Sequence, residues 1–202
     1  MGETVDMLPS WVLIIGAVLS VTGTWNYVVE TLRGNTQPNR VTWVLWGLAP
    51  LLAFIIEVQQ HVGVSSLVTL LFGVLPVFVL IASVKNPHGV WKVSPFDWFC
   101  GAISIVGIVV WLLSNHPTFG LVAQVAADVA AGLPTLRKAV LNPATESPFA
   151  FFTGVVNASL ALLVLKHWTT AGALFPLSIL VMNFIILVFI LTKWGTRLQA
   201  RF

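Results

Sequence analysis

Hydrophobic residues along this chain form seven long stretches that short polar segments separate. The stretches cover residues 10–32, 41–60, 63–84, 94–114, 117–136, 147–168 and 172–194. Each is about 20 residues long, the length that a helix needs to cross the hydrocarbon core of a bilayer. They lack the alternation of apolar and polar residues that the strands of a membrane barrel show. The pattern therefore predicts an all-α membrane protein with seven transmembrane helices.

The composition and the helix-start signals agree with this prediction. Hydrophobic residues make up 57% of the 202 residues and charged residues only 8%, too few charges for the surface of a water-soluble protein. No basic residue precedes the first stretch, so we expect a retained helix and not a cleaved signal peptide. Ser94 with Asp97 predicts a capping box for the fourth helix, and Ser147 before Pro148 predicts a cap for the sixth.

Basic residues concentrate in the connections on one side of the predicted membrane. Nine of the ten lie there, and only Lys166 lies on the other side. The nine are Arg33, Arg40, Lys85, Lys92, Arg137, Lys138, Lys193, Arg197 and Arg201. The positive-inside rule predicts that this side is cytoplasmic, with the N-terminus outside and the C-terminus inside the cell (inner) membrane. No long basic run occurs, so we expect the lipid bilayer and a small-molecule substrate as partners and no nucleic acid; a homo-oligomer stays open.

An internal repeat organises the stretches. The triplet Thr-Leu-Arg occurs at residues 31–33 and again at 135–137, and a loop with a proline follows each copy, at Pro38 and Pro143. Four crossings separate the starts of the two units, so both units have the same orientation. The predicted organisation is a first triple-helix repeat, a linker transmembrane helix and a second triple-helix repeat (3+1+3). Their bounds are residues 10–84, 94–114 and 117–194.

This layout, with the segment ADVAAGLPTLRK at residues 127–138, resembles the PQ-loop membrane proteins and their SWEET sugar-transporter relatives. The segment GNTQPNRVTW at residues 34–43 is similar to a bacterial branch of seven-helix proteins. The resemblance implies that the first, third and second helices of each unit lie side by side, with a substrate between the units near mid-membrane. Asparagines on the third helices line that site in SWEET proteins, which implies this role for Asn183. Pro134-Thr135 stands where the family has Pro-Gln.

Asp128 is the most informative ionisable residue of the stretches. It lies about ten residues into the fifth helix, or roughly 15 Å, close to the bilayer centre. An ionised carboxylate at that depth costs about 2.5 to 3.5 kcal/mol, so it must face the bundle interior. Gln124, one turn away, shares its face. Asp128 is expected to couple protons or to accept hydrogen bonds from a polar substrate; a structural carboxyl bonded to a neighbouring helix is the alternative.

Other polar and aromatic residues extend the predicted substrate site. Asn157 and Asn183 are mid-helix amides, which either line a site or join helices. Trp25 and Asn26 share a face of the first helix that can point inward. Trp46 on the second helix, like Trp25, is suited to stack on a flat or sugar-like ligand. Packing or a position at the membrane interface is the alternative for both tryptophans.

Four residues are candidates for a gate. Pro50 and Pro134 each remove a backbone hydrogen bond within a transmembrane helix, which membrane transporters tolerate where helices bend. Arg40 and Glu146 occupy roughly equivalent places in the two repeats and carry opposite charges. We therefore predict that these two side chains form an ion pair when the cytoplasmic side is closed.

The function predicted from these features is transport of a small polar molecule, sugar-like or another metabolite, by alternating access. The alternatives are a receptor or assembly partner on a PQ-loop-like scaffold, and a vitamin transporter resembling nicotinamide riboside carriers. Transport predicts a mid-membrane cavity open to one side and reached by Asp128 or Asn183. A receptor predicts a polar pocket at one mouth and a packed centre. No ligand spacing, phosphate loop or catalytic pair is present, so we expect no metal, no cofactor and no enzyme activity.

Overall fold

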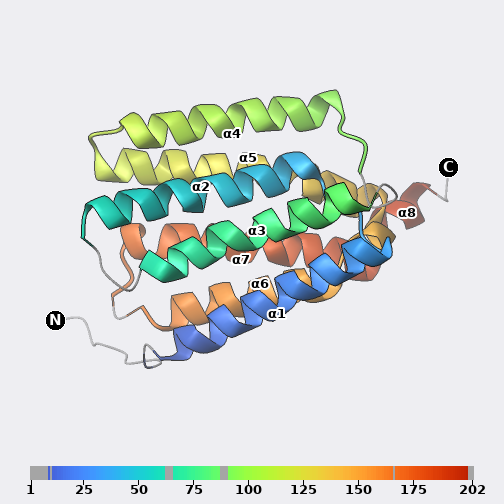
Figure 1. The fold of residues 1–202 in the computed structure, drawn as a ribbon, viewed down its shortest axis with the longest axis horizontal. Helices are drawn as coiled ribbons and strands as arrows, with labels where there is room; N and C mark the ends of the chain where they lie inside the picture. The colour runs from blue at the N-terminus through green and yellow to red at the C-terminus, as the bar shows by residue number, and fades with distance from the viewer. Residues whose placement is uncertain (1–8, 10, 62–65, 87–90, 166, 200–202) are drawn as a thin grey trace.

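A computed structural model describes residues 9, 11–61, 66–86, 91–165 and 167–199, and this part of the chain is helical and contains no strand (Figure 1). Its elements are α1 (Val12–Arg33), α2 (Arg40–Gln59), α3 (Ser66–Lys85), α4 (Pro95–Leu113), α5 (Pro117–Leu141), the 3₁₀ turn η2 (Pro143–Thr145), α6 (Pro148–Leu163), α7 (Thr170–Thr192) and α8 (Trp194–Gln199). Residues 10 and 63–65 of the predicted stretches, Lys166 and Arg201 lie outside the described residues.

Several of these helices are suited to cross a membrane. Within the described residues, α1, α2, α4, α5 and α7 are long and apolar enough to do so, while α3 and α6 are apolar but shorter. The outer surface is apolar as well: Trp98 is 68% exposed and Leu113 75%. Large apolar side chains in such positions are stable against lipid and costly against water. The chain is therefore an all-helical, multi-pass membrane protein.

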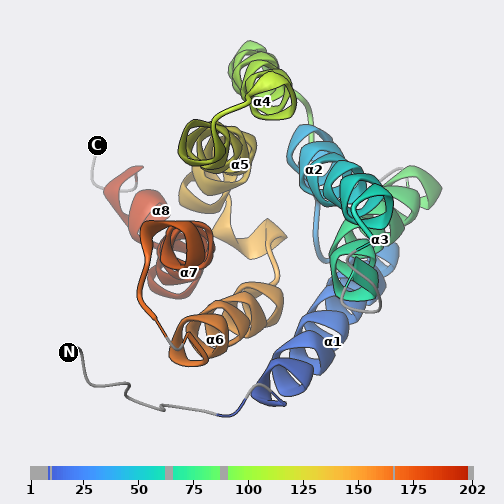
Figure 2. The same ribbon diagram turned by 90° about the vertical axis from the view of Figure 1, so that its left-hand side faces the viewer.

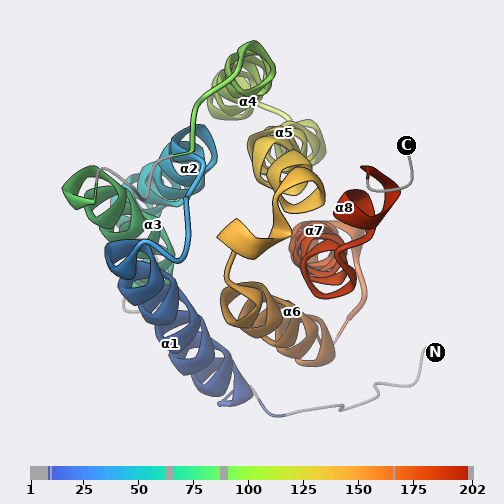
Figure 3. The same cartoon turned by 90° about the vertical axis from the view of Figure 1, so that its right-hand side faces the viewer.

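The helices form two rows that face each other (Figures 2 and 3). In one row α3 lies between α1 and α2, and in the other α7 lies between α5 and α6. The rows meet where α1 packs against α6 and where α2 packs against α5. Helix α4 lies outside both rows and packs against α5 and α2.

Capping residues fix the helix ends at the side of the bundle where α2, α4 and α6 begin. The predicted capping box is present, with Ser94 accepting from the Asp97 amide and Asp97 from the Ser94 amide. Ser147 caps α6 by accepting from the Ala150 amide, as predicted. The side chain of Asn39 caps α2 in the same way. Because α1, α3, α5 and α7 end at this side and most described basic residues lie there, it is called the basic end below.

Helix α5 is longer than the sequence indicated, and this corrects the predicted end at residue 136. Helix α1 stops directly after its Thr-Leu-Arg triplet because Gly34 adopts the left-handed conformation, with φ of 82°. After the second triplet the chain has Lys138 where α1 has Gly34, so α5 continues to Leu141. The extra turn places Lys138 inside the bundle.

Gly23 provides a test of the contact between the rows. A Cβ atom there would collide with the Thr153 side chain of α6, whereas a Cβ atom at Gly120 would lie 3.5 Å from its nearest neighbours. We expect Gly23→Ala to lower the free energy of unfolding by about 1–3 kcal/mol through overpacking. Gly120→Ala, the matched control, gains the same helix propensity without a clash. Thermal unfolding of the purified variants measures both; equal stability of the two would contradict this packing.

Candidate functional site

A cavity of about 530 Å³ lies between the two rows. Helices α1, α2, α3, α5, α6 and α7 contribute side chains to it, and α4 contributes none of the described ones. Along α2 the lining runs from Trp43 to Glu57, about 21 Å at 1.5 Å per residue. The cavity therefore extends from the second turn of α2 toward the end of the bundle opposite the basic end. A volume of this size with few polar groups is typical of small-molecule sites.

Six of the sequence-predicted residues come together here. The residues of this group that line the cavity are Asp128, Gln124, Asn157, Asn183, Trp46 and Pro50. They come from α2, α5, α6 and α7, and thus from both rows. A mid-bundle cavity reached by Asp128 and Asn183 is the arrangement that transport predicts.

Asp128 has no hydrogen bond or ion pair with any described residue, although it lines the cavity. The same holds for the side chains of Gln124 and Asn157. Interior polar groups are almost always paired with protein or with bound molecules. If Asp128 were a structural carboxyl, it would bond to a neighbouring helix. The described residues provide no such partner. These three groups are available to a ligand.

Asn183 has a mixed environment. Its Nδ2 donates to the carbonyl oxygen of Ile179, one turn earlier in α7, at 2.8 Å. Its Oδ1 packs closely against Gly154 of α6, where a side chain would leave no room for it. Asn183 therefore joins α7 to α6 while it lines the cavity.

The structure corrects two of the predicted positions, Trp25 and Asn26. Trp25 is 60% exposed, on the outer surface. At 100° per residue, a position two residues from buried Gly23 and Tyr27 lies on the opposite side of the helix. Asn26 accepts a hydrogen bond from the Ser147 hydroxyl at 3.0 Å, at the basic end and away from the cavity. Pro134, which was predicted as a gate residue, is buried within α5 outside the cavity lining, and its role in a gate stays a prediction.

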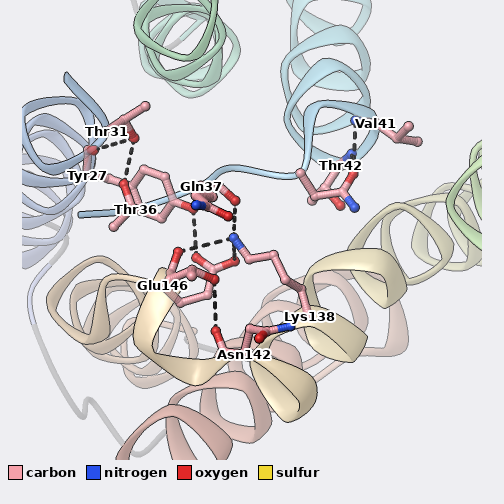
Figure 4. Close-up of polar contacts among 11 residues, drawn as sticks. Tyr27, Thr31, Thr36, Gln37, Val41, Thr42, Lys138, Asn142 and Glu146 are labelled. Carbon is pink, nitrogen blue, oxygen red and sulfur yellow. Dashed lines mark hydrogen bonds and ion pairs between the residues drawn. The ribbon is translucent and has the colours of Figure 1, made fainter. Parts of the chain in front are cut away.

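The basic end is closed by a buried ion pair (Figure 4). Lys138 Nζ lies 2.8 Å from Glu146 Oε1, and both side chains have no exposed surface. The Tyr27 hydroxyl donates to Glu146 Oε2 at 2.7 Å. Lys138 also donates to the carbonyl oxygens of Gln37 and Thr145. Since Tyr27 and Gln37 belong to one row and its loop, and the others to the second row, the network joins the two rows.

This network replaces the predicted ion pair between Arg40 and Glu146. Arg40 instead donates to the Ser83 hydroxyl at 3.1 Å and to the Ser83 carbonyl oxygen at 2.7 Å, at the end of α3. The extra turn of α5 brings Lys138 to Glu146, and Arg40 stays within its own row. Burial raises the pKa of Glu146, and the Lys138 ammonium opposes that rise.

Sequence reasoning missed Lys138 and Tyr27 as functional residues. Lys138 follows Arg137 at a helix end, where a basic side chain is usually solvated or interacts with the helix dipole. Tyr27 is the one tyrosine of the chain, and a phenol among apolar residues is a signal for a buried hydrogen bond. That signal was present in the sequence, but it did not indicate the partner.

An aromatic layer separates the ion pair from the cavity. The rings of Tyr27 and Trp43 have centroids 4.7 Å apart, and Tyr27 meets Phe151 edge-on at 6.5 Å. Trp43 and Phe151 also line the cavity. At the far end of the cavity, Thr69 donates to Glu57 at 3.0 Å. Toward the basic end, the cavity is thus bounded by aromatic rings in tilted and edge-on contact.

Comparisons with known proteins leave the family open: no protein-family model matches this chain, and no curated protein or solved structure matches it either. The resemblance to PQ-loop and SWEET proteins remains an expectation that rests on the sequence segments. Within the described residues, no group of three or more histidine, cysteine or acidic side chains is arranged to hold a metal ion.

Removal of one partner of the buried ion pair tests its role in the fold. Lys138→Met leaves a buried carboxylate without its cation, and Glu146→Gln leaves the ammonium without its anion. We expect each to lower the free energy of unfolding by about 3–5 kcal/mol, and the double variant to recover much of the loss. Glu30→Gln, which breaks the exposed pair with Arg33, is the control and should change stability little. Chemical unfolding measures all four; additive losses in the double variant would refute the pairing.

Proposed function

We propose that this protein carries a small polar molecule across a membrane by alternating access. The observation that carries the proposal is the cavity between the rows, which is bounded by a buried network at one end. It is lined by Asp128, Gln124 and Asn157, whose side chains have no partner among the described residues. Transporters built from repeats bind their substrates between the repeats near the bilayer midplane. The proposed substrate is a sugar-like molecule or another small metabolite.

In this proposal the chain has the 3+1+3 organisation, with α1–α3 and α5–α7 as parallel repeats and α4 as the linker. The helix contacts support it. In this organisation α5, α6 and α7 correspond to α1, α2 and α3. The contact between α1 and α6 then corresponds to the contact between α5 and α2, and both contacts occur. The same exchange relates the row α1–α3–α2 to the row α5–α7–α6. This arrangement is the one that the PQ-loop and SWEET resemblance implies.

The buried ion pair and the aromatic layer form the closed gate in this mechanism. To open the basic end, Tyr27 and Gln37 must separate from Glu146 and Lys138, because these contacts join the rows. Pro50 lies in α2 beside the cavity, where it weakens the backbone and provides a bending point. The described conformation is then the one with the basic end shut.

A receptor on the same scaffold is the second candidate. One observation favours it: a smaller pocket of about 280 Å³ at the basic end is lined by polar residues that include Asn26, Glu30 and Asn35. A receptor would also have a packed centre, however, and the centre of this bundle contains the larger cavity. Transport accounts for the larger cavity, which a packed receptor centre would not contain.

The basic end is proposed to face the cytoplasm, with the N-terminus outside. Cysteines introduced at Lys92 and at Asn115, which are both exposed and lie at opposite ends of α4, test this in intact cells of a Cys100→Ala background. We expect an impermeant thiol reagent to label the cysteine at position 115 and not the one at 92. The reverse pattern would show the opposite orientation.

A cross-link across the gate tests alternating access. The Gln37 amide donates to the Thr145 carbonyl oxygen at 3.0 Å, so cysteines at positions 37 and 145 lie close together. A thermal-shift screen of sugars, vitamins and amino acids first identifies a ligand. We expect oxidation of the double-cysteine variant in proteoliposomes to abolish flux of that ligand but retain its binding, and reduction to restore flux. The single Gln37→Cys variant is the control; full flux in the oxidised double variant would disprove the mechanism.

A further inference from the structure

The charges around the cavity indicate the chemical class of its ligand. Two acidic residues, Asp128 and Glu57, line it, and none of the described lining residues is lysine, arginine or histidine. Glu57 accepts a hydrogen bond from Thr69, whereas Asp128 has no partner among the described residues. A carboxylate in so apolar a setting is costly unless a positive charge accompanies it. The described protein provides no such charge, so the carboxylate is neutralised either by a proton or by a cationic ligand.

The walls of the cavity are suited to the uncharged, apolar part of a cationic ligand. Five aromatic side chains line it: Trp43, Trp46, Phe72, Phe151 and Phe175. Aromatic faces attract cations through their quadrupole and bury apolar groups at the same time.

We propose that the cavity takes a monovalent organic cation, a protonated or quaternary amine carried on an apolar or aromatic body. This inference rests on the proposed function and names its substrate class. The cationic nitrogen lies at Asp128, with the amides of Gln124 and Asn157 as neighbouring polar contacts. The aromatic side chains hold the body of the molecule. An anion would meet two carboxylates, and a neutral molecule would leave the ionised form of Asp128 without a counter-charge.

Three probes of similar shape and different charge test the inference on the full-length protein in lipid nanodiscs at neutral pH. They are phenethylamine, phenethyl alcohol and phenylacetate. We expect the amine to raise the unfolding temperature and to bind measurably by calorimetry, and the alcohol and the anion to bind at least about tenfold more weakly, the difference between a charge-assisted and a neutral contact. Sodium chloride and potassium chloride in place of the amine should produce no comparable shift.

Variants locate the charge recognition. Asp128→Asn keeps the shape of the side chain and removes its charge, so we expect amine affinity to fall at least about tenfold while alcohol affinity stays the same. Glu30→Gln is the matched control, because it removes a carboxylate outside the cavity; amine affinity should be unchanged. If Asp128→Asn does not fold, the selectivity of the wild-type protein among the three probes decides the question.

Several results would overturn the assignment. They are equal binding of amine and alcohol, preference for phenylacetate, no detectable amine binding, a shift with sodium or potassium that matches that of the amine, or an amine affinity that Asp128→Asn leaves intact. Tracer flux in proteoliposomes distinguishes a failure of the cation assignment from a failure of the proposed transport function. Amine binding without flux contradicts transport alone. Flux of a sugar by a protein that binds no amine contradicts the cation assignment alone.

Discussion

The buried ion pair between Lys138 and Glu146 is the interaction on which the closed end of the bundle depends. Removing both charges from water is costly, and further contacts offset the cost: Glu146 also accepts from Tyr27, and Lys138 also donates to two carbonyl oxygens. The net contribution of such a pair to stability is the small difference between a large desolvation cost and a large electrostatic gain. Water that enters when the rows part can therefore replace it without a large penalty.

Tyr27 connects this ion pair to the cavity. Its hydroxyl bonds to Glu146, its ring lies against Trp43, and Trp43 lines the cavity. A ligand that displaces Trp43 changes the surroundings of Tyr27, whose hydroxyl donates to Glu146. A ligand shifts a conformational equilibrium only by its different affinity for the two states, and this chain of contacts is where such a difference would arise.

The sequence predicts those features of the structure that depend on neighbouring residues, and it does not predict those that depend on contacts between distant segments. The helices are local, since apolar length and the caps at Ser94 and Ser147 define them, and the predicted stretches match the described helices to within a few residues at most ends. Asp128 could be found because a lone carboxylate at mid-helix has no other explanation. Trp25 could not be placed, since both faces of a membrane helix are apolar. Lys138 could not either, because its burial follows from one absent glycine and the fold of a distant loop.

Glu146 and Asp128 are two acidic residues of the bundle with different surroundings. Glu146 lies among partners that its own fold supplies, so its charge is satisfied in the conformation with the basic end shut. Asp128 lines the cavity with no partner in the described chain. A fold that needed Asp128 only for stability would have paired it as it paired Glu146, since an unpaired interior carboxylate weakens the bundle. The cost persists because the partner of Asp128, in the proposed mechanism, is the molecule that the protein carries.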